Sequence, residues 1–378
     1  MEKKITQQKT KRNRAGKCLP AYNKTLNDAA LYLKGIIPAK IPKSYALKPM
    51  FYKISSEKNI HSGILAYRDF LYVLCDILIA DGGLYDKPPK NAASHLSIAA
   101  RFPFLDNINN ILFKIGYHGN FADGYNSLIL RDLQLLGNSA MAEGGCGKSN
   151  LSDVKVIEVL RFLANCGFNF VGFDLDMSKP VLPKHSKLEV TYPDNPSVLT
   201  GIKVMAVAQN KLRTKNNHEI FQWCDYRVLM AEEPDAASRF NDFAHSLPVK
   251  INGFVLKMHK HCLKAGLTCY PSFCSIELRF HYLYKNKEVC SFFASPVSGY
   301  RFFIKAQNTH KYSDIIANFP MTLQEKIAKG YGCDSKKFGE PCQNGCHGFS
   351  FSLDDSVLNL ADDIKIWIDK ELSCLQGK

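Results

Sequence analysis

Apolar and polar residues alternate strictly over positions 274–282, and this run constrains the fold more than any other part of the sequence. The apolar positions are Cys274, Ile276, Leu278, Phe280 and Tyr282. A period of two is typical of a β-strand with one buried face. A polar turn at 285–287 and apolar segments through 292 and at 300–304 follow. This order predicts an antiparallel meander.

Helical signals lie on both sides of the meander. Ser246 is an expected N-cap for a helix that ends before Gly266, and Thr322 with Glu325 forms a capping-box pattern for another helix. A short strand is expected at 348–353, and a final helix presents apolar residues on one face between 357 and 372. Residues 236–378 are therefore predicted to form a C-terminal α+β domain, an antiparallel meander flanked by helices.

The preceding part of the chain predicts a second mixed domain. Its expected helices are 64–80, 104–115, 152–166 and 197–211, and its expected strands are 127–136, 168–174, 188–192 and 220–229. The run Glu232-Glu233-Pro234-Asp235 is the expected boundary. The predicted organisation is a disordered basic tail at 1–22, an N-terminal α/β domain at 23–235 and the C-terminal domain at 236–378, which makes an α+β fold of two mixed domains.

The composition is that of a globular protein. Hydrophobic residues make up 46% and charged residues 22% of the 378 residues, values that argue against a mainly disordered chain. No stretch reaches the roughly 18 uninterrupted apolar residues of a membrane span. The basic N-terminus lacks the apolar stretch of a secretory signal, and the odd number of cysteines, 13, favours a reducing compartment. We expect a soluble cytoplasmic protein without membrane contact.

Positive charge is concentrated at the N-terminus. Residues 1–17 hold seven lysines and arginines against one glutamate, so they supply +6 of the net charge of +14. Such a tail can bind the phosphates of nucleic acids without sequence preference, or can simply be solvated. Aromatic residues are not interleaved with these charges, so a stacking platform for single strands is not indicated.

Three cysteines and a histidine lie close together in a glycine-rich segment near the C-terminus. They are Cys333, Cys342, Cys346 and His347. Zinc needs four ligands, usually from paired CxxC or CxxxH motifs, and this segment has no CxxC. The neighbours Cys346 and His347 are poorly placed to face one ion, so a distant fourth ligand would come from His259, His261 or Cys262. The segment therefore predicts either a zinc or iron site, a reactive thiol, or a structural turn.

Residues 142–149, Ala-Glu-Gly-Gly-Cys-Gly-Lys-Ser, fit a relaxed phosphate-loop pattern, and Asp174 and Asp176 follow at the end of an expected buried strand. This arrangement resembles the ParA/MinD type of ATPase, and the resemblance implies nucleotide hydrolysis. The segment Gly137-Asn138-Ser139-Ala140 separates the preceding strand from the motif, and Glu143 stands where that family has a lysine. A true phosphate loop runs directly from strand to helix, so a glycine-rich surface loop is the alternative.

Asp225 and Arg227 are the carboxylate and cation with the most suggestive spacing. Two residues apart on an expected strand, they share one face and can pair. The pattern favours a structural ion pair over a catalytic acid. The sequence contains no HExxH motif, nucleophile elbow or Rossmann fingerprint.

The order helix, meander, helix, strand, helix and the form of residues 287–294 carry a resemblance over 236–375. This part resembles the YdhG-like α/β domain, a frataxin-like family of small bacterial proteins, and the resemblance implies a role in iron handling. The cysteine-rich segment departs from that family. The whole chain is also similar to an uncharacterised bacterial protein family in the segments 188–196, 201–203, 224–229, 330–333 and 346–349, a likeness that implies no activity.

These observations together favour a cytoplasmic binding or regulatory module over an enzyme, because no catalytic constellation is recognised. Three alternatives stay open: a zinc or iron protein, a phosphate-loop nucleotide hydrolase, and a nucleic-acid binder that uses the basic tail.

Overall fold

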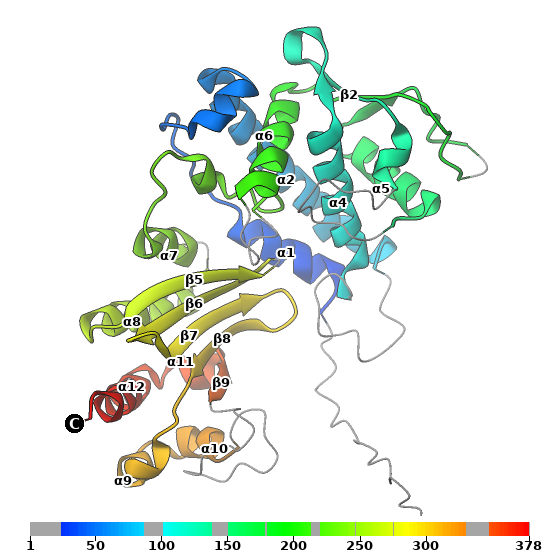
Figure 1. Cartoon of the computed structure of the whole chain (residues 1–378). Helices are drawn as coiled ribbons and strands as arrows, with labels where there is room; N and C mark the ends of the chain where they lie inside the picture. Colours follow the sequence, from blue (N-terminus) through cyan, green and yellow to red (C-terminus); the bar gives the residue numbers. More distant parts are fainter. Residues whose placement is uncertain are drawn as a thin grey trace, which may run out of the picture.

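The computed structural model describes residues 24–86, 101–137, 150–177, 180–212, 220–245, 247–274, 276–329 and 348–377. Within these residues the chain has the predicted α+β architecture, with helices packed around two antiparallel sheets (Figure 1). The first sheet has the strand order β1-β2-β4-β3, and the second has the order β5-β6-β7-β8-β9. The expected division into two domains at residue 235 stays a prediction.

Helices dominate the first part of the chain. They are α1 (Leu26–Ile36), α2 (Glu57–Asp81), α4 (Pro103–His118), α5 (Asp153–Asn165) and α6 (Ser197–Leu212). The helices α2 and α6 approach closely where Gly63 faces Gly201, since a Cβ atom on Gly201 would lie 2.1 Å from the carbonyl oxygen of Gly63. Two glycines at one crossing therefore set the distance between these helices.

The first sheet consists of four short strands, β1 (Asn120–Phe121), β2 (Ser127–Leu130), β3 (Asn169–Val171) and β4 (Leu188–Thr191). The expected strand at 127–136 is wrong in its second half, where Leu133–Leu136 forms a 3-10 helix. The side chain of Asp132 accepts a hydrogen bond of 2.9 Å from the amide of Gln134 and starts this turn.

The expected strand at 220–229 is also wrong. A turn leads to Cys224, whose φ of +55° lies in the left-handed region, and a 3-10 helix, η6, follows at Tyr226–Leu229. The amide of Asp225 donates to the carbonyl of Ile220 at 2.9 Å. This local bond and the left-handed residue exclude an extended chain, although the apolar residues are buried as the pattern suggests.

The predicted antiparallel meander is confirmed, and so is the short strand expected at 348–353. One strand, the first of this sheet, was not expected. Its strands are β5 (Thr268–Cys274), β6 (Glu277–Tyr284), β7 (Lys287–Ser295) and β8 (Gly299–Ile304), and β9 (Phe349–Ser352) pairs with β8. The alternation at 274–282 crosses a hairpin, so Cys274 belongs to the preceding strand. Lys285 and Asn286 have positive φ values of 45° and 65°, the backbone of a tight two-residue hairpin turn.

Helices cover one face of this sheet. They are α7 (Ala236–His245), α8 (Val249–Lys264), α11 (Asp355–Leu358) and α12 (Ala361–Gln376), and Figure 1 shows α8 and α12 along the sheet. The inner strand residues Leu278, Phe280 and Tyr282 are at most 1% exposed. Trp367 of α12 packs against Phe349 of β9 with ring centroids 4.9 Å apart. The sequence predicted one final helix with an apolar face between 357 and 372. In the structure these residues are divided between α11 and α12.

Two smaller expectations at helix starts have different outcomes. The helix α10 (Met321–Lys329) follows α9 (Ser313–Ala317) and begins before Thr322, so the predicted capping box is wrong. The carbonyl of Pro320 accepts hydrogen bonds from the amides of Leu323 and Gln324 instead. Ser246 lies outside the described residues.

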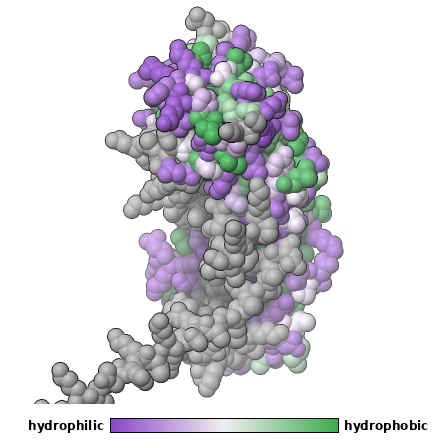
Figure 2. Space-filling model, turned by 90° about the vertical axis from the view of Figure 1, so that its right-hand side faces the viewer, coloured by the Kyte–Doolittle hydropathy of each residue, from purple (hydrophilic) through white to green (hydrophobic). Residues whose placement is uncertain are grey.

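One side of the described surface is mainly polar. Figure 2 shows one side of the molecule, where hydrophilic residues cover most of the described surface and hydrophobic ones are exposed among them. Scattered exposed apolar residues are normal for a folded protein. None of the helices within the described ranges combines the length and apolar character needed to cross a membrane.

Candidate ligand site

Most of the residues that the sequence singles out lie outside the described residues. This applies to Cys333, Cys342, Cys346 and His347, to residues 142–149 and to the basic tail. Metal binding, phosphate binding and nucleic-acid binding at these places therefore stay predictions. In the part of the chain that the structure describes, no group of three or more histidine, cysteine, aspartate or glutamate side chains is placed to hold a metal ion.

The residues considered as a distant fourth metal ligand each have another partner. His259 Nδ1 lies 2.9 Å from the hydroxyl of Tyr282 in the core. His261 Nε2 lies 2.8 Å from Asp369 Oδ1 on α12. The sulfur of Cys262 lies 3.5 Å from that of Cys290. These contacts explain the three side chains as parts of the packing between α8, the sheet and α12.

Asp174 and Asp176, expected beside a phosphate loop, lie after the short strand β3. Residues 169 and 171 of that strand are exposed, so the expected buried strand is wrong. Asp174 Oδ1 accepts a hydrogen bond of 2.9 Å from the amide of Asp176. The first carboxylate therefore stabilises a local turn.

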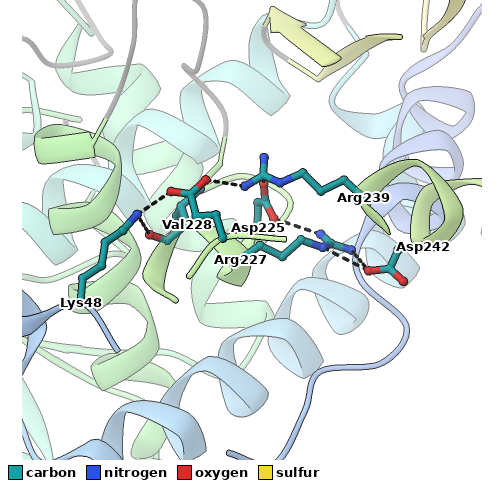
Figure 3. Close-up of polar contacts among 7 residues, drawn as sticks. Lys48, Asp225, Arg227, Val228, Arg239 and Asp242 are labelled. Atoms are coloured by element: carbon teal, nitrogen blue, oxygen red, sulfur yellow. Dashed lines mark hydrogen bonds and ion pairs between the residues drawn. The ribbon is translucent and has the colours of Figure 1, made fainter. Parts of the chain in front are cut away.

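The predicted pairing of Asp225 with Arg227 is confirmed, although both residues lie at the start of η6 and not on a strand. Arg227 Nη1 donates to Asp225 Oδ1 at 3.0 Å, and Arg227 Nη2 donates to Asp242 Oδ2 at 2.9 Å (Figure 3). The exposed fractions of the Asp225 and Arg227 side chains are 1% and 7%. A buried ion pair of this kind is stable only if each charge has an opposite charge and hydrogen-bond partners close to it.

This pair is the centre of a longer chain of alternating charges. Arg239 Nη1 lies 3.7 Å from Asp225 Oδ2, and its Nη2 donates to Glu233 at 2.8 Å. Glu233 also pairs with Lys48, whose ammonium group donates to the carbonyl of Val228 at 2.8 Å (Figure 3). Three acidic and three basic side chains thus alternate between the segment before α2, the segment around η6 and α7, and we call them the charge chain.

The charge chain keeps Arg227 ionised. Burial alone would lower the pKa of Arg227, but the charge of Asp225 and the hydrogen bonds to Asp242 and Asp225 outweigh burial and raise that pKa above its usual value. The three basic and three acidic side chains of the charge chain therefore form a fixed group without net charge.

A small cavity of about 70 Å³ lies against this group. Its walls are mainly apolar: residues 36–39 at the end of α1, Trp223, Phe243 of α7, and Leu278 and Phe280 of β6. Its polar lining consists of Asp225, Arg227, Arg239, Asp242 and His245. Segments nearly 250 residues apart in sequence meet here, so no local motif could have indicated the site.

The arrangement can accept a small molecule with an apolar body. Trp223, Phe243 and Phe280 supply aromatic surface, and the half-exposed carboxylate of Asp242, with 56% of its side chain exposed, can accept a hydrogen bond at the polar end. The positive charges that line the cavity are already paired with carboxylates. A neutral ligand with one polar group therefore fits better than an anion.

Comparisons with known proteins do not add a function: no family model, curated protein or solved structure matches the chain. The resemblance of residues 236–375 to the YdhG-like domain stays a prediction.

Proposed function

We propose that this chain is a cytoplasmic binding module, and that it binds a small neutral molecule with an apolar body and one hydrogen-bonding group. The observation that carries the proposal is the cavity between α1, α7 and β6, with apolar walls and a buried ion pair at one end. Small-molecule sites in proteins are mostly apolar with a few fixed polar groups. They occur preferentially at places such as domain interfaces and the spaces between packed helices.

The charge chain supports this proposal because it makes the site rigid before a ligand arrives. Arg227 is held at two points by Asp225 and Asp242, and Arg239 is held by Glu233. A polar end that is already ordered loses little entropy on binding.

The cysteines support the cytoplasmic setting. The described cysteines Cys75, Cys166, Cys224, Cys262, Cys269, Cys290 and Cys374 all carry free thiols. The sulfurs of Cys262 and Cys290 remain unbonded at 3.5 Å. Free thiols at this distance fit a reducing compartment.

Thermal unfolding in the presence of phenol tests the proposal. Phenol has an aromatic body and one hydroxyl group, and a ligand that binds only the folded state stabilises it by about 1.4 kcal/mol at ten times its Kd. We expect the unfolding temperature to rise with phenol concentration and to level off.

The matched control is Ala39→Phe. Ala39 is exposed and lines the cavity, so a larger side chain there can block the opening without disturbing the core. A rise in the unfolding temperature that is the same in the variant and the wild type, or that is absent from both, would contradict binding at this site.

A further inference from the structure

The face of the second sheet opposite α8 carries three polar side chains on adjacent strands. They are Ser272 on β5, His281 on β6 and Glu288 on β7, three strands that lie side by side in Figure 1. Ser272 Oγ lies 2.9 Å from His281 Nε2, and His281 Nδ1 lies 2.7 Å from Glu288 Oε1. A hydroxyl, an imidazole and a carboxylate are therefore joined in a line by two hydrogen bonds.

The chemistry of the partners fixes the proton positions in this line. Burial by itself would raise the pKa of Glu288, but the hydrogen bond from His281 and the charge of Arg279 outweigh burial and lower it. An ionised carboxylate can only accept hydrogen bonds. Nδ1 of His281 therefore carries a proton and donates the hydrogen bond to Glu288. In the neutral imidazole, Nε2 then has a free lone pair and accepts the hydroxyl proton of Ser272.

Arg279 holds the carboxylate of Glu288 in place. It stands opposite Ser272 in the strand register, and its guanidinium donates to Glu288 at 3.0 Å and to Ser291 at 3.1 Å. The side chain is 36% exposed. The positive charge of Arg279 therefore helps to keep Glu288 ionised and fixed beside His281.

The line of side chains can be reached from solvent. Ser272 is partly exposed on β5, which is the edge strand of the sheet. Tyr270, two residues earlier on the same face, is 57% exposed, and its ring centroid lies 6.3 Å from that of His281. Its ring offers an apolar contact for the substituent of a reacting molecule.

We propose that Ser272, His281 and Glu288 form a reactive serine site that takes acyl esters: Ser272 is the nucleophile, His281 the general base and Glu288 the group that orients the imidazole. The hydrogen-bonded order nucleophile, base, carboxylate is the geometry by which a serine becomes reactive. A polar ladder that merely stabilises the sheet would have the same hydrogen bonds but no chemical reactivity.

The reaction balances with water as the second substrate. Ser272 Oγ bonds to the acyl carbon while its proton moves to His281 Nε2. The bond from that carbon to the leaving oxygen then breaks, and the alcohol leaves with the proton from His281. Water attacks the acyl-serine, gives one proton to His281, and displaces Ser272 Oγ, which takes that proton back. One ester and one water yield one acid and one alcohol.

Covalent labelling with a fluorophosphonate tests the site directly. In this reaction Ser272 Oγ bonds to phosphorus, fluoride leaves, and His281 takes the hydroxyl proton. Peptide mass spectrometry of the labelled full-length protein is expected to find the adduct on Ser272. Hydrolysis of p-nitrophenyl acetate, followed as release of p-nitrophenolate, is expected to be lost in Ser272→Ala.

The base is tested with two variants of His281. His281→Asn can still donate a hydrogen bond to Glu288 but has no base at the position of Nε2, so the labelling rate should fall at least about 100-fold. In His281→Ala, added imidazole should restore part of the rate, which a purely structural role would not allow. Thermal unfolding checks that both variants are folded.

Ser350 is the matched control. It lies on β9 of the same sheet, and its hydroxyl accepts a hydrogen bond of 2.8 Å from Arg301 instead of contacting a histidine. Ser350→Ala should leave both rates unchanged. The proposal is overturned if Ser272 in the folded wild type labels no faster than Ser350. Unchanged labelling in a folded His281→Asn variant overturns it as well.

Discussion

Arg227 donates a hydrogen bond of 3.0 Å to Asp225 although both side chains are almost fully buried, with exposed fractions of 7% and 1%. Two neighbouring charges, Asp242 and Arg239, extend the pair in both directions. The pair therefore fixes the segment around η6 against α7 and forms the polar end of the cavity. Its energetic role follows from burial, because a charge that loses its partner here cannot be solvated by water.

Replacing Arg227 by methionine should lower the free energy of unfolding by about 3 kcal/mol, since Asp225 would keep only the longer contact to Arg239. Urea unfolding measures this change. The control is Lys250→Met in the pair with Asp355, where both side chains are 75% exposed and the expected loss is below about 1 kcal/mol. Equal losses in the two variants would contradict the claim that burial makes the ion pair of Arg227 more important for stability than an exposed pair.

Gly201→Ala should disrupt the crossing of α2 and α6. A Cβ atom there would lie 2.1 Å from the carbonyl oxygen of Gly63 and 2.5 Å from Cβ of Tyr67, so the helices must move apart, with a loss of about 3 kcal/mol or more. The matched change is Gly253→Ala in α8, where a Cβ meets nothing within 4 Å. That variant should be stabilised by about 0.5–1 kcal/mol. Thermal unfolding of both variants checks the opposite signs, and a loss of stability in Gly253→Ala would contradict the account of these helices.

Glu371 should be essential for the contact between α12 and the loop that follows β8. Its buried carboxylate accepts hydrogen bonds from the amides of Gln307 and Asn308, from the Asn308 side chain and from the Tyr312 hydroxyl. Glu371→Ala leaves several of these donors unsatisfied and should cost about 3 kcal/mol. Asp369→Ala, on the same helix and 49% exposed, should cost below about 1 kcal/mol. Urea unfolding measures the free energy of unfolding that each variant loses relative to the wild type. Similar losses in the two variants would contradict this role of Glu371.

Stability should decrease in mild acid because of His259. Burial lowers the pKa of His259 from 6.5 to about 4, so between these values the unfolded chain binds a proton that the folded chain does not. The free energy of unfolding therefore falls as the pH decreases from 6.5 towards 4, by about 1 kcal/mol per pH unit at most. Urea unfolding at several pH values should show a smaller slope in His259→Gln than in the wild type. A slope unaffected by His259→Gln would contradict this assignment.

Local patterns predicted most of the helices and the meander, but neither the turn at 220–229 nor the places where distant elements meet. The alternation around Leu278 and Phe280 predicted the meander because burial of one face imposes a period of two. The spacing of Asp225 and Arg227 predicted that the two side chains pair, but it did not predict the backbone conformation of this segment. The left-handed conformation of Cys224 and the turn before it depend on tertiary packing.

The two proposed sites needed the three-dimensional structure. Ser272, His281 and Glu288 come together only through the register of three strands, and a bulge at Tyr282 and Leu283 shifts that register. The cavity combines residues 36–39 with Trp223 and β6. A single sequence does not contain such long-range contacts as a local signal.

Tryptophan fluorescence tests the binding site most directly, because the chain has two tryptophans: Trp223 lines the cavity, and Trp367 is fully buried between α12 and β9. The ligand is 2,2,2-trichloroethanol, a small apolar alcohol whose chlorine atoms quench tryptophan emission. We predict saturable quenching in the wild type, and only weak, linear quenching in Trp223→Phe and in Ala39→Phe. Quenching that is linear in the wild type, or that saturates equally in Trp223→Phe, would contradict a ligand site at this cavity.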